Sequence, residues 1–234
     1  MANIKPEFKN EWIYHVYNRG VEKRNIFLNE RDYVRFMYNM FVCNGQERVF
    51  HLERLSNEEI IQFINNASAN EEKQLVEILN FALMPNHFHI SLKQKVDGGI
   101  VSFMQKLGIS STMCFNKKYE RVGPLFQGNF KASSVGLDDA HFLYIPHYIH
   151  LNPLDLMRGD RQYIQTADKM HFLENYRWSS LPDYLGKNNF SNILNKDFLL
   201  TKFGGSAKYK KELLKALKEK EGINQTLFDE FDEN

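Results

Sequence analysis

Two histidines separated by one apolar residue are the first feature of the sequence that could carry chemistry. His87 and His89 lie in the segment HFHISLK, where apolar and polar residues alternate after the turn signal Met84-Pro85-Asn86. On a β-strand this spacing puts both imidazoles on one face of the sheet and turns Phe88 toward the other. The pair could bind a metal ion, but such pairs also occur as ordinary polar surface residues. The spacing alone leaves both interpretations open.

A tyrosine and an asparagine four residues apart form the second feature. Tyr148 and Asn152 would project from one face of a helix, about one turn apart. That pairing could place a nucleophilic phenol beside a metal-bound amide. The alternative is an ordinary core tyrosine followed by an asparagine that ends the helix before Pro153. Pro146 interrupts the same segment, either as a kink or as the first residue of a new helix.

Hydrophobic periodicity predicts the elements that must hold these side chains. Strands are expected at residues 11–18, 75–84 and 87–93, with a loop or short strand within 123–135. Helices are expected at 30–42 after the cap Asn29, at 57–66 after the cap Ser56, from Gly98-Gly99 to Lys118 with Met113 among its core residues, from Asp138 and Asp139 to Asn152, and at 208–220. This order predicts an α+β fold of ferredoxin-like type, an antiparallel sheet with helices packed on one face.

A domain boundary is expected at Gly159-Asp160, between residues 1–159 and a C-terminal part of residues 160–234. The C-terminal part consists of an aromatic-rich connector and a lysine-rich helical extension, both accessory to the first core. No run of about 18 apolar residues occurs, and the N-terminus has no apolar leader. We therefore expect a cytoplasmic protein without a membrane partner.

Overall charge does not indicate nucleic-acid binding, because 30 Lys and Arg balance 29 Asp and Glu to a net charge of +1. Basic residues do gather between Met104 and Lys131. This segment contains five basic residues and one acidic residue, with aromatic residues between them. Such a run is either a solvated face or a nucleic-acid contact. The two cysteines, Cys43 and Cys114, lack metal-binding spacing and are expected to be buried reduced thiols.

Five motifs occur in a fixed order along the chain. MPNHFH begins at Met84 and YIHLNP at Tyr148, and they are accompanied by YHVYNRGVEKRNIF, GPLFQGNFKA and YRWSSLPDYLG. Together they resemble the single-tyrosine HUH transposases, the group that includes the insertion-sequence-200 type and the REP-associated tyrosine transposases. The similarity spans residues 11–186. It implies the HUH endonuclease fold for residues 1–159.

The resemblance also implies a role for each residue of the two features. His87 and His89 correspond to the HUH pair of metal ligands, Tyr148 to the nucleophile, and Asn152 to a third ligand through its side-chain oxygen; some relatives carry glutamine at this last position. Imidazole, amide and water ligands suit Mg²⁺ or Mn²⁺. The implied activity is a metal-dependent DNA transposase and endonuclease that cleaves and rejoins single-stranded or hairpin DNA through a 5′-phosphotyrosine.

DNA would be held by basic grooves and by stacking of bases on aromatic rings. The candidates for phosphate contacts are Arg19, Lys23, Arg24, Lys117, Lys118, Arg121 and Lys131. The acting species is either a monomer or a homodimer. One alternative is a catalytically inactive nucleic-acid-binding domain on the same fold. Another is an unrelated metallohydrolase built on the two histidines, which the absence of a further Asp or His at short ligand spacing disfavours.

Overall fold

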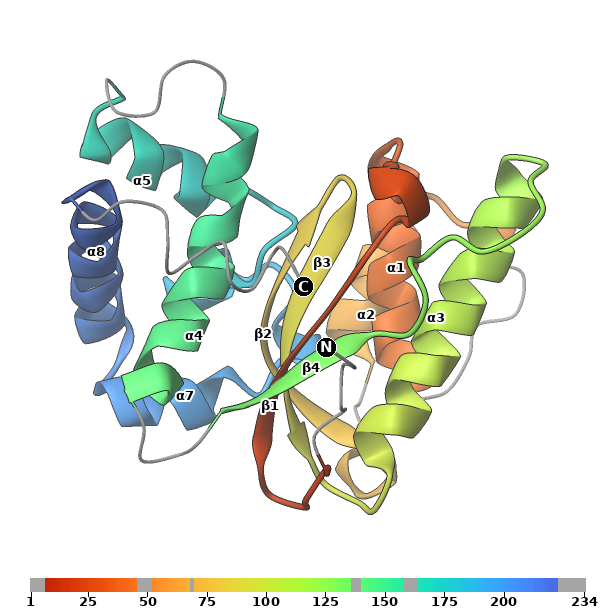
Figure 1. Ribbon diagram of the computed structural model, residues 1–234, viewed down its shortest axis with the longest axis horizontal. Helices are drawn as coiled ribbons and strands as arrows, with labels where there is room; N and C mark the ends of the chain where they lie inside the picture. Colours follow the sequence, from red (N-terminus) through yellow and green to blue (C-terminus); the bar gives the residue numbers. More distant parts are fainter. Residues whose placement is uncertain (1–6, 46–51, 68–69, 136–139, 158–163, 223–234) are drawn as a thin grey trace.

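A four-stranded antiparallel sheet forms the centre of the protein (Figure 1). The computed structural model describes residues 7–45, 52–67, 70–135, 140–157 and 164–222. The strands are β1 (Ile13–Arg19), β2 (Val76–Met84), β3 (His87–Gln94) and β4 (Lys131–Val135), in the order β2-β3-β1-β4. Each neighbouring pair is antiparallel.

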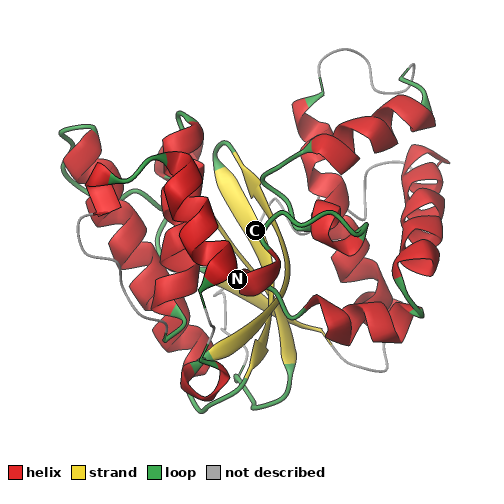
Figure 2. Cartoon of the chain, turned by 180° about the vertical axis from the view of Figure 1, so that it is seen from behind, coloured by secondary structure: helices red, strands yellow, loops and turns green. Residues whose placement is uncertain are grey.

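Helices cover both faces of this sheet (Figures 1 and 2). On one side lie α1 (Glu30–Cys43), α2 (Asn57–Asn66) and α3 (Gly99–Lys118); on the other lie α4 (Ala140–Leu151), α5 (Thr166–Asn175), α6 (Leu181–Tyr184), α7 (Lys196–Phe203) and α8 (Ser206–Gly222). Short 3-10 turns are η1 (Val21–Lys23), η2 (Leu52–Arg54), η3 (Glu71–Lys73), η4 (Asn152–Leu156) and η6 (Ser191–Ile193). No described helix is long and apolar enough to cross a membrane.

The order β1-α1-β2-β3-α3-β4, with α2 inserted after α1, confirms the predicted ferredoxin-like α+β fold. The prediction that helices cover only one face of the sheet is wrong. α4 and the helices after it cover the second face (Figure 2), because that face also carries apolar side chains that must be shielded from water.

Alternation along the strands creates two hydrophobic cores. From β3, Phe88 and Ile90 enter the core shared with α1, α2 and α3. The second core contains Ile13 of β1, Val135 of β4 and Ile149 of α4. Because the side-chain period of a strand is two, the residues on either side of Phe88 face α4.

The C-terminal part of the chain covers the free edge of β2. The amide of Leu83 donates to the Trp178 carbonyl at 2.8 Å, and the amide of Ser180 donates to the Phe81 carbonyl at 3.0 Å. A sheet edge left open exposes unpaired backbone groups, so this contact protects the edge and joins residues 164–222 to the sheet. The motif YRWSS supplies the residues that make it.

Both predicted helix caps are present as capping boxes. Asn29 caps α1 with Asp32 at the third helical position, and Ser56 caps α2 with Glu59. The predicted start of α3 at Gly98-Gly99 is also confirmed. Gly98 has a φ of 68°, and a Cβ on Gly99 would meet the Leu75 carbonyl oxygen at 2.3 Å, so only glycine fits this close approach.

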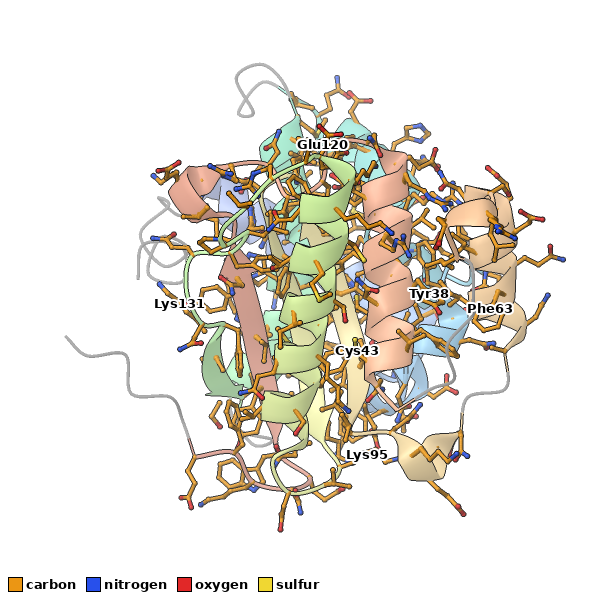
Figure 3. The ribbon with its side chains drawn as sticks, turned by 90° about the vertical axis from the view of Figure 1, so that its right-hand side faces the viewer. Tyr38, Cys43, Phe63, Lys95, Glu120 and Lys131 are labelled. Atoms are coloured by element: carbon orange, nitrogen blue, oxygen red, sulfur yellow. The ribbon has the colours of Figure 1, made fainter. Side chains whose placement is uncertain are left out.

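Three smaller expectations need correction. Met113 is 66% exposed on α3 and does not belong to the core, and Cys114 is only partly buried, whereas Cys43 is buried between α1 and α3 (Figure 3). α4 runs through Pro146 without a break. Asp138 and Asp139, the expected start of this helix, lie outside the described residues.

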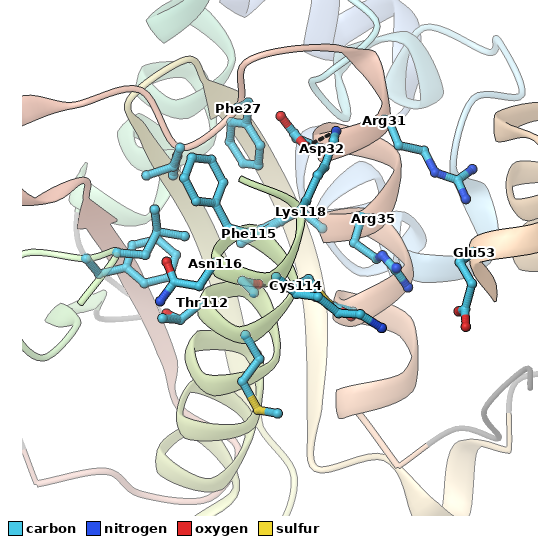
Figure 4. A pocket seen from close by; sticks show the side chains of 18 residues that line it. Phe27, Arg31, Asp32, Arg35, Glu53, Thr112, Cys114, Phe115, Asn116 and Lys118 are labelled. Carbon is cyan, nitrogen blue, oxygen red and sulfur yellow. Dashed lines mark hydrogen bonds and ion pairs between the residues drawn. The ribbon is translucent and has the colours of Figure 1, made fainter. Parts of the chain in front are cut away.

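A buried carboxylate joins the start of α1 to the end of α3. The Asp32 side chain, 7% exposed, accepts hydrogen bonds from the Leu28 amide at 2.8 Å and the Tyr119 hydroxyl at 2.7 Å. Lys118 Nζ forms an ion pair with it at 2.6 Å (Figure 4). Because the carboxylate is buried and accepts several hydrogen bonds, this ion pair is expected to contribute more to the free energy of unfolding than a pair on the surface does.

We expect Asp32→Ala to lower the free energy of unfolding by about 3 kcal/mol, because it removes the ion pair with Lys118 and leaves the Leu28 amide and the Tyr119 hydroxyl without their acceptor. Glu30→Ala is the matched control. Glu30 lies in the same helical turn but pairs with Arg177 at an exposed site, so its loss should cost under about 0.5 kcal/mol. Urea unfolding of both variants measures the difference. Similar losses for the two would contradict a structural role for Asp32.

Candidate active site

Both histidines of the first feature lie on the sheet face that α4 covers. In the register of β3 with β1, His87 faces Arg19 and His89 faces Tyr17. The centroids of the two imidazoles are 5.1 Å apart. His87 is half-buried, whereas His89 is 1% exposed. The strand therefore presents one accessible and one fully enclosed imidazole side by side.

Asn152 reaches the same place from the other layer. It is the first residue of η4, directly after α4, and its side-chain oxygen lies 3.4 Å from His87 Nε2. Its amide nitrogen is 3.4 Å from the Tyr148 carbonyl oxygen. The four-residue spacing thus places the asparagine amide one turn beyond the tyrosine, next to the more accessible histidine.

Tyr148 lies beside the enclosed histidine. Its ring meets the His89 ring edge to face, with centroids 5.5 Å apart, and it also contacts His15 at 5.7 Å. The side chain is 2% exposed and belongs to the second hydrophobic core. The tyrosine and both histidines therefore converge, in a closed arrangement.

Polar contacts from three other elements hold α4 in this position. A β-bulge between Ile78 and Asn80 lets Asn80 donate to the Pro146 carbonyl at 3.1 Å, two residues before Tyr148. His150 hydrogen-bonds to the Ser180 hydroxyl at 2.8 Å and to the Tyr209 hydroxyl of α8 at 2.6 Å. These bonds fix the helix that carries the tyrosine against both the sheet and the C-terminal helices.

A third histidine completes the cluster, and sequence reasoning missed it. His15 of β1 is fully buried, and its Nε2 lies 2.8 Å from His89 Nδ1. The alternating segment IYHVYNR contained a signal, since it puts His15 on the face opposite Tyr14 and Val16. Only the pairing of β1 with β3 reveals that this face is shared with His89.

Burial keeps the inner imidazoles neutral. It lowers the pKa of His15 from its usual value to about 3. The pKa of His89 is lowered well below its usual range, first by burial and then by the nearby His15, His87 and Arg19. A neutral imidazole retains the lone pair that a metal ligand needs.

The residues present fit a divalent cation. His89 Nε2 is buried and has no hydrogen-bond partner among the described residues. His87 Nε2 and the Asn152 oxygen lie close to one another, so two imidazoles and an amide oxygen could share one ion. No group of three or more His, Cys, Asp or Glu suited to a metal ion occurs in the described ranges.

Four of the predicted DNA-contact residues lie near this cluster. Arg19 stands opposite His87, and Lys131 stands opposite Tyr17 on the same face of the sheet. Lys131 is the first residue of the edge strand β4 (Figure 3). Lys23 and Arg24 lie in the turn after β1, where the Lys23 carbonyl accepts a hydrogen bond from the Asn86 side chain. Arg19 Nε is buried without a hydrogen-bond partner among the described residues.

The other three predicted DNA-contact residues lie at the end of α3, in the opposite helical layer. Lys117 is exposed, Lys118 pairs with Asp32, and Arg121 donates to Asn116 at 2.8 Å. Lys117 and Lys118 line a groove of about 790 Å³ between α1 and α3 (Figure 4). This groove contains none of the clustered histidines, so it is separate from the candidate active site.

Comparison with known families identifies the chain. Residues 33–152 match the family described as "Transposase IS200 like", which is 120 of the 234 residues and includes the paired histidines, Tyr148 and Asn152. The chain belongs to this IS200-like transposase family. The match begins after β1, so His15 lies outside it.

A solved structure supports the same fold for this IS200-like transposase. It is described as "Structure of the REP associates tyrosine transposase bound to a REP hairpin" and is 10% identical, with a TM-score of 0.53. The similarity covers 82% of this chain and 90% of that one. At this identity the likeness is one of fold. No curated protein matches the chain.

Proposed function

We propose that this chain is a metal-dependent endonuclease that cleaves and rejoins single-stranded, hairpin-forming DNA, with Tyr148 as nucleophile. The observation that carries the proposal is the convergence of Tyr148 with His87, His89 and Asn152, from the sheet and from the helical layer that covers it. The substrate class is supported by the family and by the REP hairpin to which the structurally similar protein is bound.

The metal site would consist of His87, His89 and Asn152. A bound Mg²⁺ or Mn²⁺ would supply positive charge to the phosphate and to the phenol as its proton leaves. Asn152 and the two imidazoles would hold this charge next to Tyr148. They are neutral ligands, so they leave the ion's positive charge available to the anionic substrate.

The reaction exchanges one phosphodiester for another. The Tyr148 oxygen forms a bond to phosphorus, and the bond from phosphorus to the 3′-oxygen breaks. The phenol loses one proton, and the released 3′-oxygen gains one to become a hydroxyl. The product is a 5′-phosphotyrosine. A second DNA 3′-hydroxyl can then attack this ester, restore the phenol and join the two DNA ends without a cofactor such as ATP.

Substrate binding would draw on the basic residues of the site face. Arg19 is the strongest candidate for a phosphate contact. Its Nε is buried without an acceptor among the described residues, and a phosphate oxygen would supply the missing hydrogen bond. Lys131 lies on the same face. Lys118 would contribute less, since Asp32 already pairs with its charge.

The burial of Tyr148 has a mechanistic consequence. With 2% of the side chain exposed, a phosphate can reach the phenol only after α4 or its neighbours shift. The same burial favours the second candidate function, a DNA-binding domain that does not cleave. The two functions differ in one observable, the covalent bond between protein and DNA.

The test is incubation of the full chain with Mn²⁺ and a single-stranded hairpin oligonucleotide labelled at its 3′-end. We expect a labelled species that migrates as a protein–DNA adduct on a denaturing gel and that does not form when EDTA is present from the start of the reaction. The released upstream fragment should carry a 3′-hydroxyl that a polymerase can extend. Tight binding without an adduct would instead identify the non-cleaving domain.

Asn152 tests the composition of the metal site. We expect Asn152→Ala to raise the Mn²⁺ concentration for half-maximal adduct formation by about 10-fold or more, because a ligand is lost. Asn152→Gln keeps an amide oxygen and should retain more of the affinity. Asn175→Ala, which changes an exposed asparagine at the end of α5, is the control. An unchanged Mn²⁺ requirement in Asn152→Ala would exclude this residue as a ligand.

A further inference from the structure

His15 and His89 form a pair of nearly parallel imidazole rings, and no step of the proposed reaction gives His15 a role. The two rings are 5.0 Å apart between centroids and inclined by only 18°, and both are enclosed by the protein. His15 Nε2 and His89 Nδ1 are 2.8 Å apart, the distance of a good hydrogen bond. A buried polar pair of this kind restrains both rings.

Strand register brings the two rings together. His15 lies directly opposite Ser91, and His89 lies opposite Tyr17, so the two histidines are diagonal neighbours on one sheet face. Diagonal neighbours on antiparallel strands are within reach of ring-sized side chains. The pairing of β1 with β3 therefore places His15 Nε2 within hydrogen-bond distance of His89 Nδ1.

The identity of that nitrogen carries chemical information. A neutral imidazole has one nitrogen that donates and one that accepts. His89 can offer a lone pair from Nε2 only when its proton resides on Nδ1. In that tautomer Nδ1–H donates to His15 Nε2, which must accept, and His15 then carries its own proton on Nδ1.

We infer that His15 is a positioning residue that holds His89 in the tautomer and ring orientation needed to bind the cation through Nε2. The inference rests on the metal site of the proposed function and deepens it. His15 is not itself a ligand in this arrangement, because its Nε2 is occupied by His89. It occupies the place that a carboxylate or backbone carbonyl takes behind many metal-bound histidines.

The contact with Tyr148 gives His15 a second role. Its ring meets the tyrosine ring edge to face at 5.7 Å and also stacks on Tyr17 at 5.2 Å. A flat side chain at this position therefore supports the inner ligand and the nucleophile together. Loss of the ring's shape would disturb packing, whereas loss of its acceptor alone would disturb only the tautomer of His89.

Binding of Mn²⁺ to the full chain without DNA separates these effects. We expect His15→Phe, which keeps a flat ring but removes the acceptor, to weaken Mn²⁺ affinity by about 10- to 100-fold in calorimetry or Mn²⁺ electron paramagnetic resonance. His15→Gln can place an amide oxygen near the former Nε2 and should recover part of the affinity. Ser91→Ala is the matched control, since Ser91 is buried on the same face, directly opposite His15.

Equal Mn²⁺ affinity in wild type, His15→Phe and Ser91→Ala would overturn the inference while leaving the nuclease proposal intact. The converse result is a wild type that forms no DNA adduct and a His15→Phe variant that binds Mn²⁺ more weakly than the wild type does. That result would support the inference and contradict the nuclease proposal. If His15→Phe does not fold, the tautomer of His89 in the wild-type protein tests the inference. Long-range ¹H–¹⁵N spectra at saturating Mg²⁺ should show His89 protonated on Nδ1, and a proton on Nε2 would overturn the inference.

Discussion

Replacing Tyr148 with phenylalanine is expected to abolish the covalent protein–DNA adduct, with a loss of more than about 1,000-fold in adduct formed, because no other group takes over a removed nucleophile. The phenylalanine ring keeps the edge-to-face contacts with His15 and His89. Removal of one hydroxyl should change the free energy of unfolding by about 1 kcal/mol or less. The loss of adduct would thus reflect chemistry and not unfolding.

Tyr144→Phe provides the matched control for this prediction. Tyr144 lies one turn earlier on α4, and its ring stacks on Tyr148 at 6.1 Å between centroids. The Tyr144→Phe variant should still form the adduct seen on a denaturing gel, and its affinity for hairpin DNA in a mobility-shift assay should be unchanged. An adduct that persists in Tyr148→Phe would assign the nucleophile to another residue. Cleavage that persists without an adduct would indicate hydrolysis by a bound water.

Replacing His87 with alanine is expected to lower adduct formation by at least about 100-fold, since even an outer partner of a metal ligand is worth about 10- to 100-fold. His87 is the half-buried member of the pair, and its side chain contacts Asn86 and Asn152 at the site's edge. We therefore expect the free energy of unfolding to change by only about 1 kcal/mol. Mn²⁺ calorimetry and the adduct assay measure the effect.

His89→Ala is expected to lose activity for two reasons at once. His89 is 1% exposed and hydrogen-bonded to His15, so truncation leaves a cavity and a buried imidazole without its partner, at a cost of about 2–4 kcal/mol. His87→Ala is therefore the cleaner test of metal dependence. His171→Ala, an exposed histidine on α5, controls for loss of any histidine. Undiminished Mn²⁺ binding in His87→Ala would contradict the proposed ligand set.

Local patterns predicted much of the fold correctly because they act within a few residues. Alternation over HFHISLK defines a strand whose even and odd positions face opposite sides, which placed His87 and His89 together. Capping residues located the starts of α1 and α2. These signals come from backbone hydrogen bonding and side-chain period, both of which are local.

Long-range pairing could not be predicted in the same way. The position of α4 over the histidine face depends on how apolar surfaces from distant segments fit together, including the bulge that lets Asn80 reach Pro146. The alternative that a new helix starts at Pro146 is wrong, because α4 runs through this residue. Tertiary packing maintains the helix although proline lacks an amide donor. The second helical layer was missed because the sheet's second apolar face was not recognised.

By itself, the sequence determined the strand that carries the two histidines, the spacing of Tyr148 and Asn152, and the resemblance to a transposase family. Only the tertiary structure decided that these features meet, that Tyr148 is enclosed where they meet, and that His15 stands behind His89. The physical reason is the distance along the chain. His15 and His89 are 74 residues apart, and only the register between two strands brings them into contact.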